Sequence, residues 1–128
     1  MNNSLSRFGN VWTRIKTYNN WYVLTWPLNR LNGSAKILET KNGMRIFVRN
    51  IFGNDFVVTH EMFSRDDYQV SSLSPQSAEP VILDLGANIG AFTVFAAGLY
   101  SKARIFSYEP AETNFRTLIK NIELNNLQ

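Results

Sequence analysis

The sequence contains no cysteine and a single histidine, His60. Disulfide bonds, thiolate zinc sites and a cysteine nucleophile are therefore excluded, and His60 cannot build a multi-histidine metal centre. Long apolar runs are also missing, because the longest, about residues 91–100, is far shorter than the roughly 20 residues that cross a bilayer. Residues 1–4 are polar and lack the features of a signal peptide. We therefore expect a cytoplasmic protein with no metal site and no membrane contact.

The sequence also has little excess charge of either sign. The net charge is +3, and the excess of basic residues lies before Pro80, where they are scattered singly among apolar and amide residues. A nucleic-acid surface usually gathers Lys and Arg on one face, so this distribution favours an ordinary solvated surface over a nucleic-acid partner. With 45% hydrophobic residues, the 128-residue chain is long enough for one compact core, and two full domains would not fit.

The first region, residues 1–79, is predicted to hold a helical segment and a β-hairpin. Aromatic residues gather in residues 5–31 at spacings that fit one or two short helices, and we expect them to pack on the fold or on a partner subunit. They are Phe8, Trp12, Tyr18, Trp21, Tyr22 and Trp26. Strand-like runs at 35–40 and 44–49 flank Asn42-Gly43, a pair typical of hairpin turns in which both residues take positive φ.

A short helix and a linker follow the hairpin. Residues 55–63 have apolar side chains at helical spacing, and the predicted helix ends before Arg65. His60 lies on this helix beside Glu61, and such an isolated histidine is assigned no role. Residues 71–80 are rich in Ser and Pro, which is typical of a linker, so we place the boundary between two regions near Glu79.

The second region, residues 80–128, has the pattern strand, glycine turn, helix, strand, helix. The predicted elements are residues 81–85, 89–100, 104–108 and 111–125. This order begins a parallel α/β sheet. The continuous apolar run of the first strand predicts burial on both faces, and the first helix, apolar nearly all round, is expected to lie deep against the sheet. An apolar stripe predicts the core-facing side of the last helix: Phe115, Leu118, Ile119 and Ile122.

The first strand runs directly into a glycine turn, Gly86 to Gly90. Ligands of open α/β sheets bind at the carboxyl ends of strands, where such a turn lets the backbone approach the ligand. The dinucleotide fingerprint needs glycine where this sequence has Asn88, so a pyrophosphate fits poorly. The carboxylate of Asp84 would repel a phosphate and attract a cation. S-adenosylmethionine has an ammonium, a sulfonium and no phosphate, so both arguments favour it over NAD.

The second strand ends in a carboxylate, that of Glu109. In this position it can accept both hydroxyl hydrogens of an adenosine ribose, and Pro110 could offer its ring to the adenine. Each residue alone has a simpler interpretation. The glycines could serve only the turn and close packing, Asn88 could cap the helix, and Glu109 could be a carboxylate at a helix start. Their joint placement at strand ends favours a ligand site.

Three motifs resemble the FkbM-type methyltransferases: residues 81–93 (VILDLGANIGAFT), Tyr-Glu-Pro at 108–110, and the asparagine-containing helix 114–125. The resemblance runs from about residue 35 to the end. It implies a class I methyltransferase fold, which is Rossmann-like, with S-adenosylmethionine as cofactor and O-methylation of a sugar or other small-molecule acceptor. The implied cofactor site consists of Asp84, Gly86, Ala87, Asn88 and Gly90 at the methionine end, with Glu109 and Pro110 at the adenosine.

The FkbM-type fold continues through further strands that shape the acceptor pocket, whereas this sequence ends at Gln128. We therefore expect an N-terminal fragment with a partial α/β fold. Because the strands that shape the acceptor pocket are absent, no catalytic residue can be named. Two parallel strands alone would leave apolar edges exposed, which is a poor arrangement for a stable monomer, so an oligomer is an open alternative. Two alternatives are an RNA methyltransferase, which would need a denser basic face, and a non-catalytic interaction module built on the aromatic N-terminus.

Overall fold

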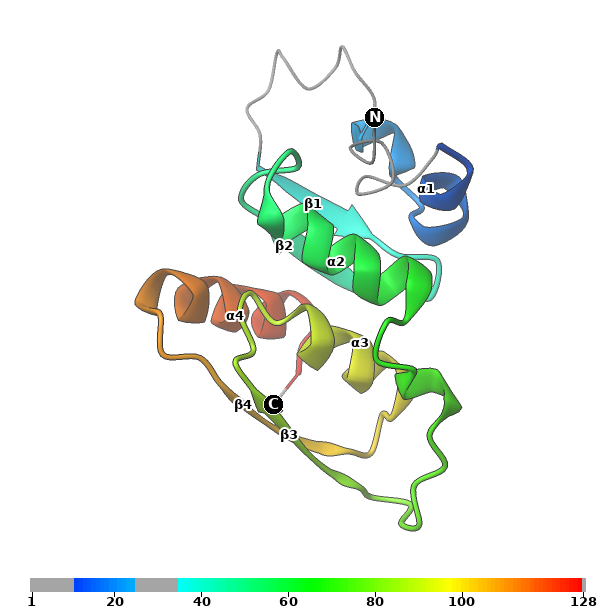
Figure 1. Cartoon of the computed structure of the whole chain (residues 1–128), viewed down its shortest axis with the longest axis vertical. Helices are drawn as coiled ribbons and strands as arrows, with labels where there is room; N and C mark the ends of the chain where they lie inside the picture. Colours follow the sequence, from blue (N-terminus) through cyan, green and yellow to red (C-terminus); the bar gives the residue numbers. More distant parts are fainter. Residues whose placement is uncertain (1–10, 25–34, 128) are drawn as a thin grey trace, which may run out of the picture.

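The protein is a mixed α/β chain in this computed structural model, which describes residues 11–24 and 35–127 (Figure 1). The described elements are α1 (Val11–Thr17), η1 (Trp21–Leu24), β1 (Lys36–Glu39), β2 (Arg45–Val48), α2 (Asn54–Arg65), η3 (Val70–Ser72), β3 (Val81–Leu85), α3 (Ala91–Leu99), β4 (Arg104–Tyr108) and α4 (Glu112–Leu124). Within these ranges, no helix has the length and apolar character needed to cross a membrane. The aromatic residues Phe8 and Trp26 lie outside the described residues.

The N-terminal aromatic residues are only partly packed. Tyr18, just after α1, is fully buried, and Trp21 packs against the same core. Trp12 is 70% exposed and Tyr22 54% exposed. The expected packing on the fold is thus confirmed for Tyr18 and Trp21. Trp12 and Tyr22 do not pack on the described fold, and for them the alternative of a partner subunit stays a prediction.

Strands β1 and β2 form the predicted antiparallel hairpin, paired over all their residues. The turn differs from the expected one, because Gly43, at φ 85°, is the sole positive-φ residue of the connection 40–44. The backbone of Thr40 bonds to that of Met44, and its hydroxyl donates to the side chain of Asn42. The result is a longer loop with one left-handed glycine, a common hairpin connection in which Asn42 needs no positive φ.

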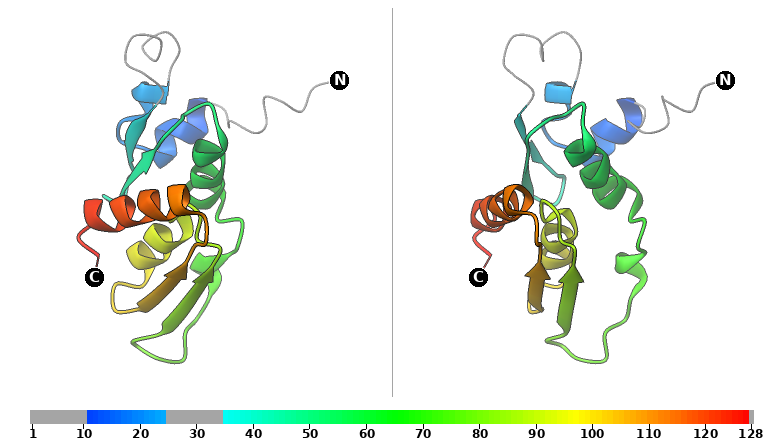
Figure 2. Two further views of the ribbon diagram at one scale, coloured as in Figure 1. Left: turned by 90° about the vertical axis from the view of Figure 1, so that its left-hand side faces the viewer. Right: turned by 60° about the vertical axis from the view of Figure 1, so that its left-hand side comes forward.

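Strands β3 and β4 form the predicted parallel pair, with α3 on one of its faces (Figure 2). The prediction that β3 is buried on both faces is wrong for the described chain. Leu83 and Leu85 are 62% and 75% exposed, and their partners Phe106 and Tyr108 on β4 are exposed on the same face. An apolar strand is suited to burial, but burial also requires a second covering layer, which the described residues do not supply.

Helix α3 lies at the centre, in contact with α2, α4, β2 and β4. It begins at Ala91 because Gly90, at φ 84°, takes the left-handed N-cap position. Val94 and Ala96 are fully buried, whereas Leu99 is 39% exposed. The expected deep burial therefore holds for most of this helix and not for its C-terminal end.

Helix α4 is joined to the hairpin by polar side chains. The fully buried Asn121 accepts the backbone N–H of Phe47 at 2.6 Å, and its amide donates to the carbonyls of Phe47 at 3.1 Å and Ile89 at 2.8 Å. One turn later, Asn125 bonds the N–H and carbonyl of Arg45 at 2.7 and 2.6 Å. These two amides satisfy alternate residues along the open edge of β2, as a neighbouring strand would.

The predicted apolar stripe of α4 is buried only in part. Leu118 is 1% exposed, whereas Phe115 and Ile119 are 43% and 37% exposed. The two exposed side chains border a hollow beside Ile105 of β4. As with β3, the described residues provide no element on that side to cover them.

The predicted linker is an exposed segment between α2 and β3. Helix α2 ends at Arg65 and is followed by the left-handed C-cap residue Asp66. Further along, residues 71–79 are exposed. The Tyr100 hydroxyl anchors the start of the segment by donating to the carbonyl of Val70 at 2.7 Å. Contacts of α2 with α3 and of α4 with β2 pass across the predicted boundary. The division near residue 79 stays a prediction.

Candidate functional site

The turn after β3 is held by the neighbouring strand. The backbone N–H groups of Gly86 and Ala87 both donate to the carbonyl oxygen of Tyr108 at 2.9 Å. Gly86, Asn88 and Gly90 have positive φ values of 82°, 53° and 84°. Glycine takes this conformation readily and asparagine tolerates it, so the residue types match the backbone that the turn requires.

Glu109 braces this turn from the end of β4. Its Oε2 accepts the backbone N–H of Asn88 at 2.8 Å, and its Oε1 accepts that of Ala111 at 2.8 Å. The alternative that Asn88 caps the following helix is wrong, because the N-cap residue of α3 is Gly90. Each carboxylate oxygen of Glu109 keeps a further lone pair, which remains available to a hydroxyl donor.

The two glycines of the turn have different surroundings. A Cβ atom on Gly90 would lie 2.6 Å from Cδ1 of Leu118, so this glycine makes room for α4. A Cβ atom on Gly86 would meet no atom within 4 Å. Gly90 therefore serves helix packing, and Gly86 leaves the space at the end of β3 open.

Asp84 is nearly buried, at 9% exposure, one residue before the end of β3. Its Oδ2 accepts the hydroxyl of Thr93 at 2.6 Å, which in turn lies 2.7 Å from the hydroxyl of Ser107. Because Thr93 gives its one hydroxyl proton to Asp84, Ser107 donates to Thr93. Burial raises the pKa of Asp84; the bond from Thr93 opposes this shift, and the charge of Glu109 adds to it.

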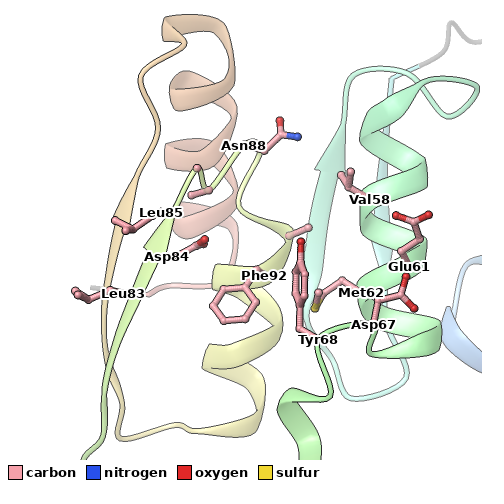
Figure 3. A pocket seen from close by; sticks show the side chains of 13 residues that line it. Val58, Glu61, Met62, Asp67, Tyr68, Leu83, Asp84, Leu85, Asn88 and Phe92 are labelled. Atoms are coloured by element: carbon pink, nitrogen blue, oxygen red, sulfur yellow. The ribbon is translucent and has the colours of Figure 1, made fainter.

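A cavity of about 540 Å³ lies between this turn and α2 (Figure 3). Its lining comes from α2, the loop after α2, β3 with its turn and the start of α3: Val58, Glu61, Met62, Asp67, Tyr68, Leu83, Asp84, Leu85, Gly86, Ala87, Asn88, Ala91 and Phe92. Three of these side chains are carboxylates and none is Lys or Arg. The volume suits a nucleoside-sized ligand, and the charge favours a cation.

Four of the seven predicted cofactor residues line this cavity: Asp84, Gly86, Ala87 and Asn88. Gly90 lies beneath α4, while Glu109 and Pro110 are not part of the lining. The roles of all seven stay predictions. The wall formed by α2 was missed, because nothing in the sequence around Glu61 and Met62 marks them as neighbours of a turn more than twenty positions away.

Comparison with known proteins points to methyltransferases. The chain is similar to Methyltransferase sdnD of Sordaria araneosa, with 35% identity over 65 residues, which are 51% of this chain and 24% of that protein. It is also similar to Methyltransferase 1 of Beauveria bassiana, with 36% identity over 67 residues, 52% of this chain and 26% of that protein. The chain thus spans about a quarter of the length of these curated relatives. No protein-family model and no solved structure matches it.

Proposed function

We propose that this chain forms the S-adenosylmethionine-binding part of a methyltransferase of the FkbM type. The observation that carries the proposal is the cavity at the carboxyl end of β3, where the buried Asp84 adjoins an open glycine turn and no basic side chain contributes to the lining. Such a site suits a ligand that has positive charges and no phosphate. The likeness to two methyltransferases supports the methyltransferase part of this proposal.

The amino-acid end of the cofactor fits between two opposite charges. The first turn of α3 has backbone N–H groups without acceptors inside the helix, and Ala91 and Phe92 of this turn line the cavity. A helix N-terminus of this kind attracts a carboxylate, whereas Asp84 attracts a cation. Glu109, on the far side of the turn, would receive the ribose hydroxyls.

When bound, S-adenosylmethionine supplies a methyl group on a positively charged sulfur, open to in-line attack by an oxygen of the acceptor. This chain's contribution is to bind and orient that group, since such transfers depend mainly on positioning. We propose the hydroxyl of a sugar or another small metabolite as the acceptor, because the FkbM resemblance implies that class.

The proposal is tested by calorimetric titration of the 128-residue chain with S-adenosylmethionine. We expect binding by the unaltered chain and an affinity at least about tenfold weaker in Asp84→Asn, which keeps the shape of the side chain and removes its charge. Glu123→Gln, on the exposed outer side of α4, is the matched control and should bind normally. Binding of NAD in preference to S-adenosylmethionine would contradict the proposal.

The same titration should depend on pH. The charged form of Asp84 attracts the cation, and burial raises the pKa of this carboxyl. Affinity should therefore fall as the pH drops towards that raised pKa, and Asp84→Asn should lose this part of the pH dependence. Identical pH profiles for the two proteins would show that Asp84 does not face the ligand.

A further inference from the structure

We propose that Thr93 of α3 is a positioning residue of the cofactor site, an inference that rests on the function proposed above. Its hydroxyl donates to Oδ2 of Asp84 at 2.6 Å, and both side chains are buried. Within residues 11–24 and 35–127, no other group donates a hydrogen bond to this carboxylate. Thr93 therefore fixes one oxygen of Asp84 and leaves Oδ1 to the cationic end of S-adenosylmethionine.

The bond from Thr93 is unlike those of the threonines in the other helices. In α1, α2 and α4 a threonine hydroxyl donates to the backbone carbonyl four residues earlier, at 2.8, 2.7 and 3.0 Å: Thr17, Thr59 and Thr117. Such a bond satisfies the hydroxyl within its own helix. For Thr93 the corresponding carbonyl is that of Ile89, which already accepts a side-chain amide from α4. The hydroxyl of Thr93 instead crosses to β3.

The sheet places a second hydroxyl behind Thr93. Asp84 and Ser107 are partners in the parallel pair of β3 and β4, so their side chains leave neighbouring strands on the same face. The Ser107 hydroxyl lies 2.7 Å from that of Thr93 and donates to it. A β-branched side chain also has few rotamers in a helix. The proton of Thr93 is thus held in the direction of Asp84.

Thr93 approaches Asp84 from the side away from the ligand. Asp84 lines the cavity, whereas Thr93 and Ser107 line the hollow beside β4 and α4 instead. Figure 3 shows Asp84 pointing from β3 towards α3, away from the exposed leucines of that strand. The hydroxyl of Thr93 therefore orients the carboxylate without competing with a cation for the space in the cavity.

The same bond favours the charged form of Asp84. Burial raises the pKa of Asp84, the bond from Thr93 lowers it, and the charge of Glu109 at the end of β4 raises it. Helix α3 has no charged residue, and the other ionisable side chains that line the cavity include no base: Glu61, Asp67 and Tyr68. Loss of the Thr93 hydroxyl would therefore raise the pKa of Asp84, and the cation would lose its charged partner at a higher pH.

Calorimetric titration of the full chain with S-adenosylmethionine at a series of pH values tests this role. In Thr93→Val, a methyl group replaces the hydroxyl. We expect its affinity at neutral pH to be about tenfold weaker, and the midpoint of the loss in acid to rise by about one pH unit. Thr93→Ser keeps a hydroxyl and should restore most of both. Thr117→Val makes the same change at a buried threonine of α4 outside the cavity lining, and should alter neither.

The variant Asp84→Asn separates an effect through Asp84 from a general effect on folding. In this background Thr93→Val should weaken binding by less than about twofold further, because no charge is left to position. Equal losses in the two backgrounds would show a structural role and overturn the inference. Thr93→Ala, which puts no γ carbon against the carboxylate, replaces Thr93→Val if far-UV circular dichroism shows that variant to be unfolded.

The remaining outcomes distinguish the inference from the function on which it rests. Unchanged affinity and an unchanged pH midpoint in Thr93→Val would overturn the inference alone, since the unaltered chain would still bind the cofactor. Weaker binding without a shift of the midpoint would also overturn it, because the bond would then not act on the charge of Asp84. If the unaltered chain does not bind S-adenosylmethionine, the proposed function fails and the inference fails with it.

Discussion

His60 is a base enclosed in the core with neither ring nitrogen hydrogen-bonded within the described chain. It is 2% exposed and stacks on Phe56 at 5.3 Å between ring centroids, with the ring of Tyr18 at 6.1 Å. Burial lowers the pKa of His60 from 6.5 to about 4, and the nearby charges of Arg14 and Arg65 add to the shift. This histidine is therefore kept neutral by its surroundings and lies outside the lining of the cavity.

This lowered pKa predicts an acid-sensitive fold. Between pH 6.5 and about 4 the unfolded chain binds a proton at His60 that the folded chain does not, so the free energy of unfolding falls as the pH falls through this window. At pH 5 the loss should reach about 2 kcal/mol relative to neutral pH. Urea denaturation at pH 7 and pH 5 measures it.

The variant His60→Phe separates this effect from other titrating groups. A phenyl ring of similar size can stack on Phe56 without binding a proton, so the variant should lose less stability than the unaltered chain between pH 7 and pH 5. Equal losses in the two proteins would mean that His60 is protonated in the folded state or does not control the pH response.

Helix α4 replaces a strand at the edge of the hairpin. A strand edge exposes N–H and carbonyl groups at every second residue, and residues four apart on a helix lie on one face. Asn121 and Asn125 therefore reach alternate residues of β2 from one side of α4. The arrangement fixes the register between an element of the first region and the last element of the second.

Removing one of these amides should loosen that contact. Asn121→Ala would leave the N–H of Phe47 and the buried carbonyl of Ile89 without their partner, so we expect the free energy of unfolding to fall by about 2 to 3 kcal/mol. Glu123→Ala, two positions away and exposed, is the control and should change it by less than about 0.5 kcal/mol. Urea denaturation gives both values. Equal effects of the two changes would show that the Asn121 bonds contribute nothing.

The whole molecule is layered, with α3 between the parallel pair and the hairpin with α2 (Figure 2). The apolar core contains Leu38 and Ile46 from the hairpin, Phe56 from α2 and Phe95 from α3. Side chains from both predicted regions thus share one core. We expect these side chains to lose their contacts together when the chain unfolds, because neither region encloses them alone.

We therefore expect the chain to unfold in one transition. All the tryptophans lie before residue 30, so their fluorescence reports the first region, whereas far-UV circular dichroism reports all helices. Followed in urea, the two signals should have the same midpoint, as in two-state unfolding. Two separate midpoints would instead establish two independent domains divided near residue 79.

The sequence determined the features that depend on neighbours along the chain. Strands β3 and β4 match the predicted residues because an apolar run between turn-forming residues is a local signal, and helices α3 and α4 follow from apolar spacing after the turns. The turn at Gly86 and Asn88 was equally predictable from the sequence, since only certain residue types accept its backbone conformation. The prediction of a cation-binding site at Asp84 came from the same local pattern.

The tertiary structure alone decided which segments meet. It placed Glu61 across the cavity from Asp84, gave Asn121 the backbone of β2 as its partner and brought Leu118 against Gly90. It also left Leu83 exposed, although the strand pattern indicated burial on both faces. These facts depend on distances between residues that are far apart in sequence, and neither periodicity nor composition records such distances.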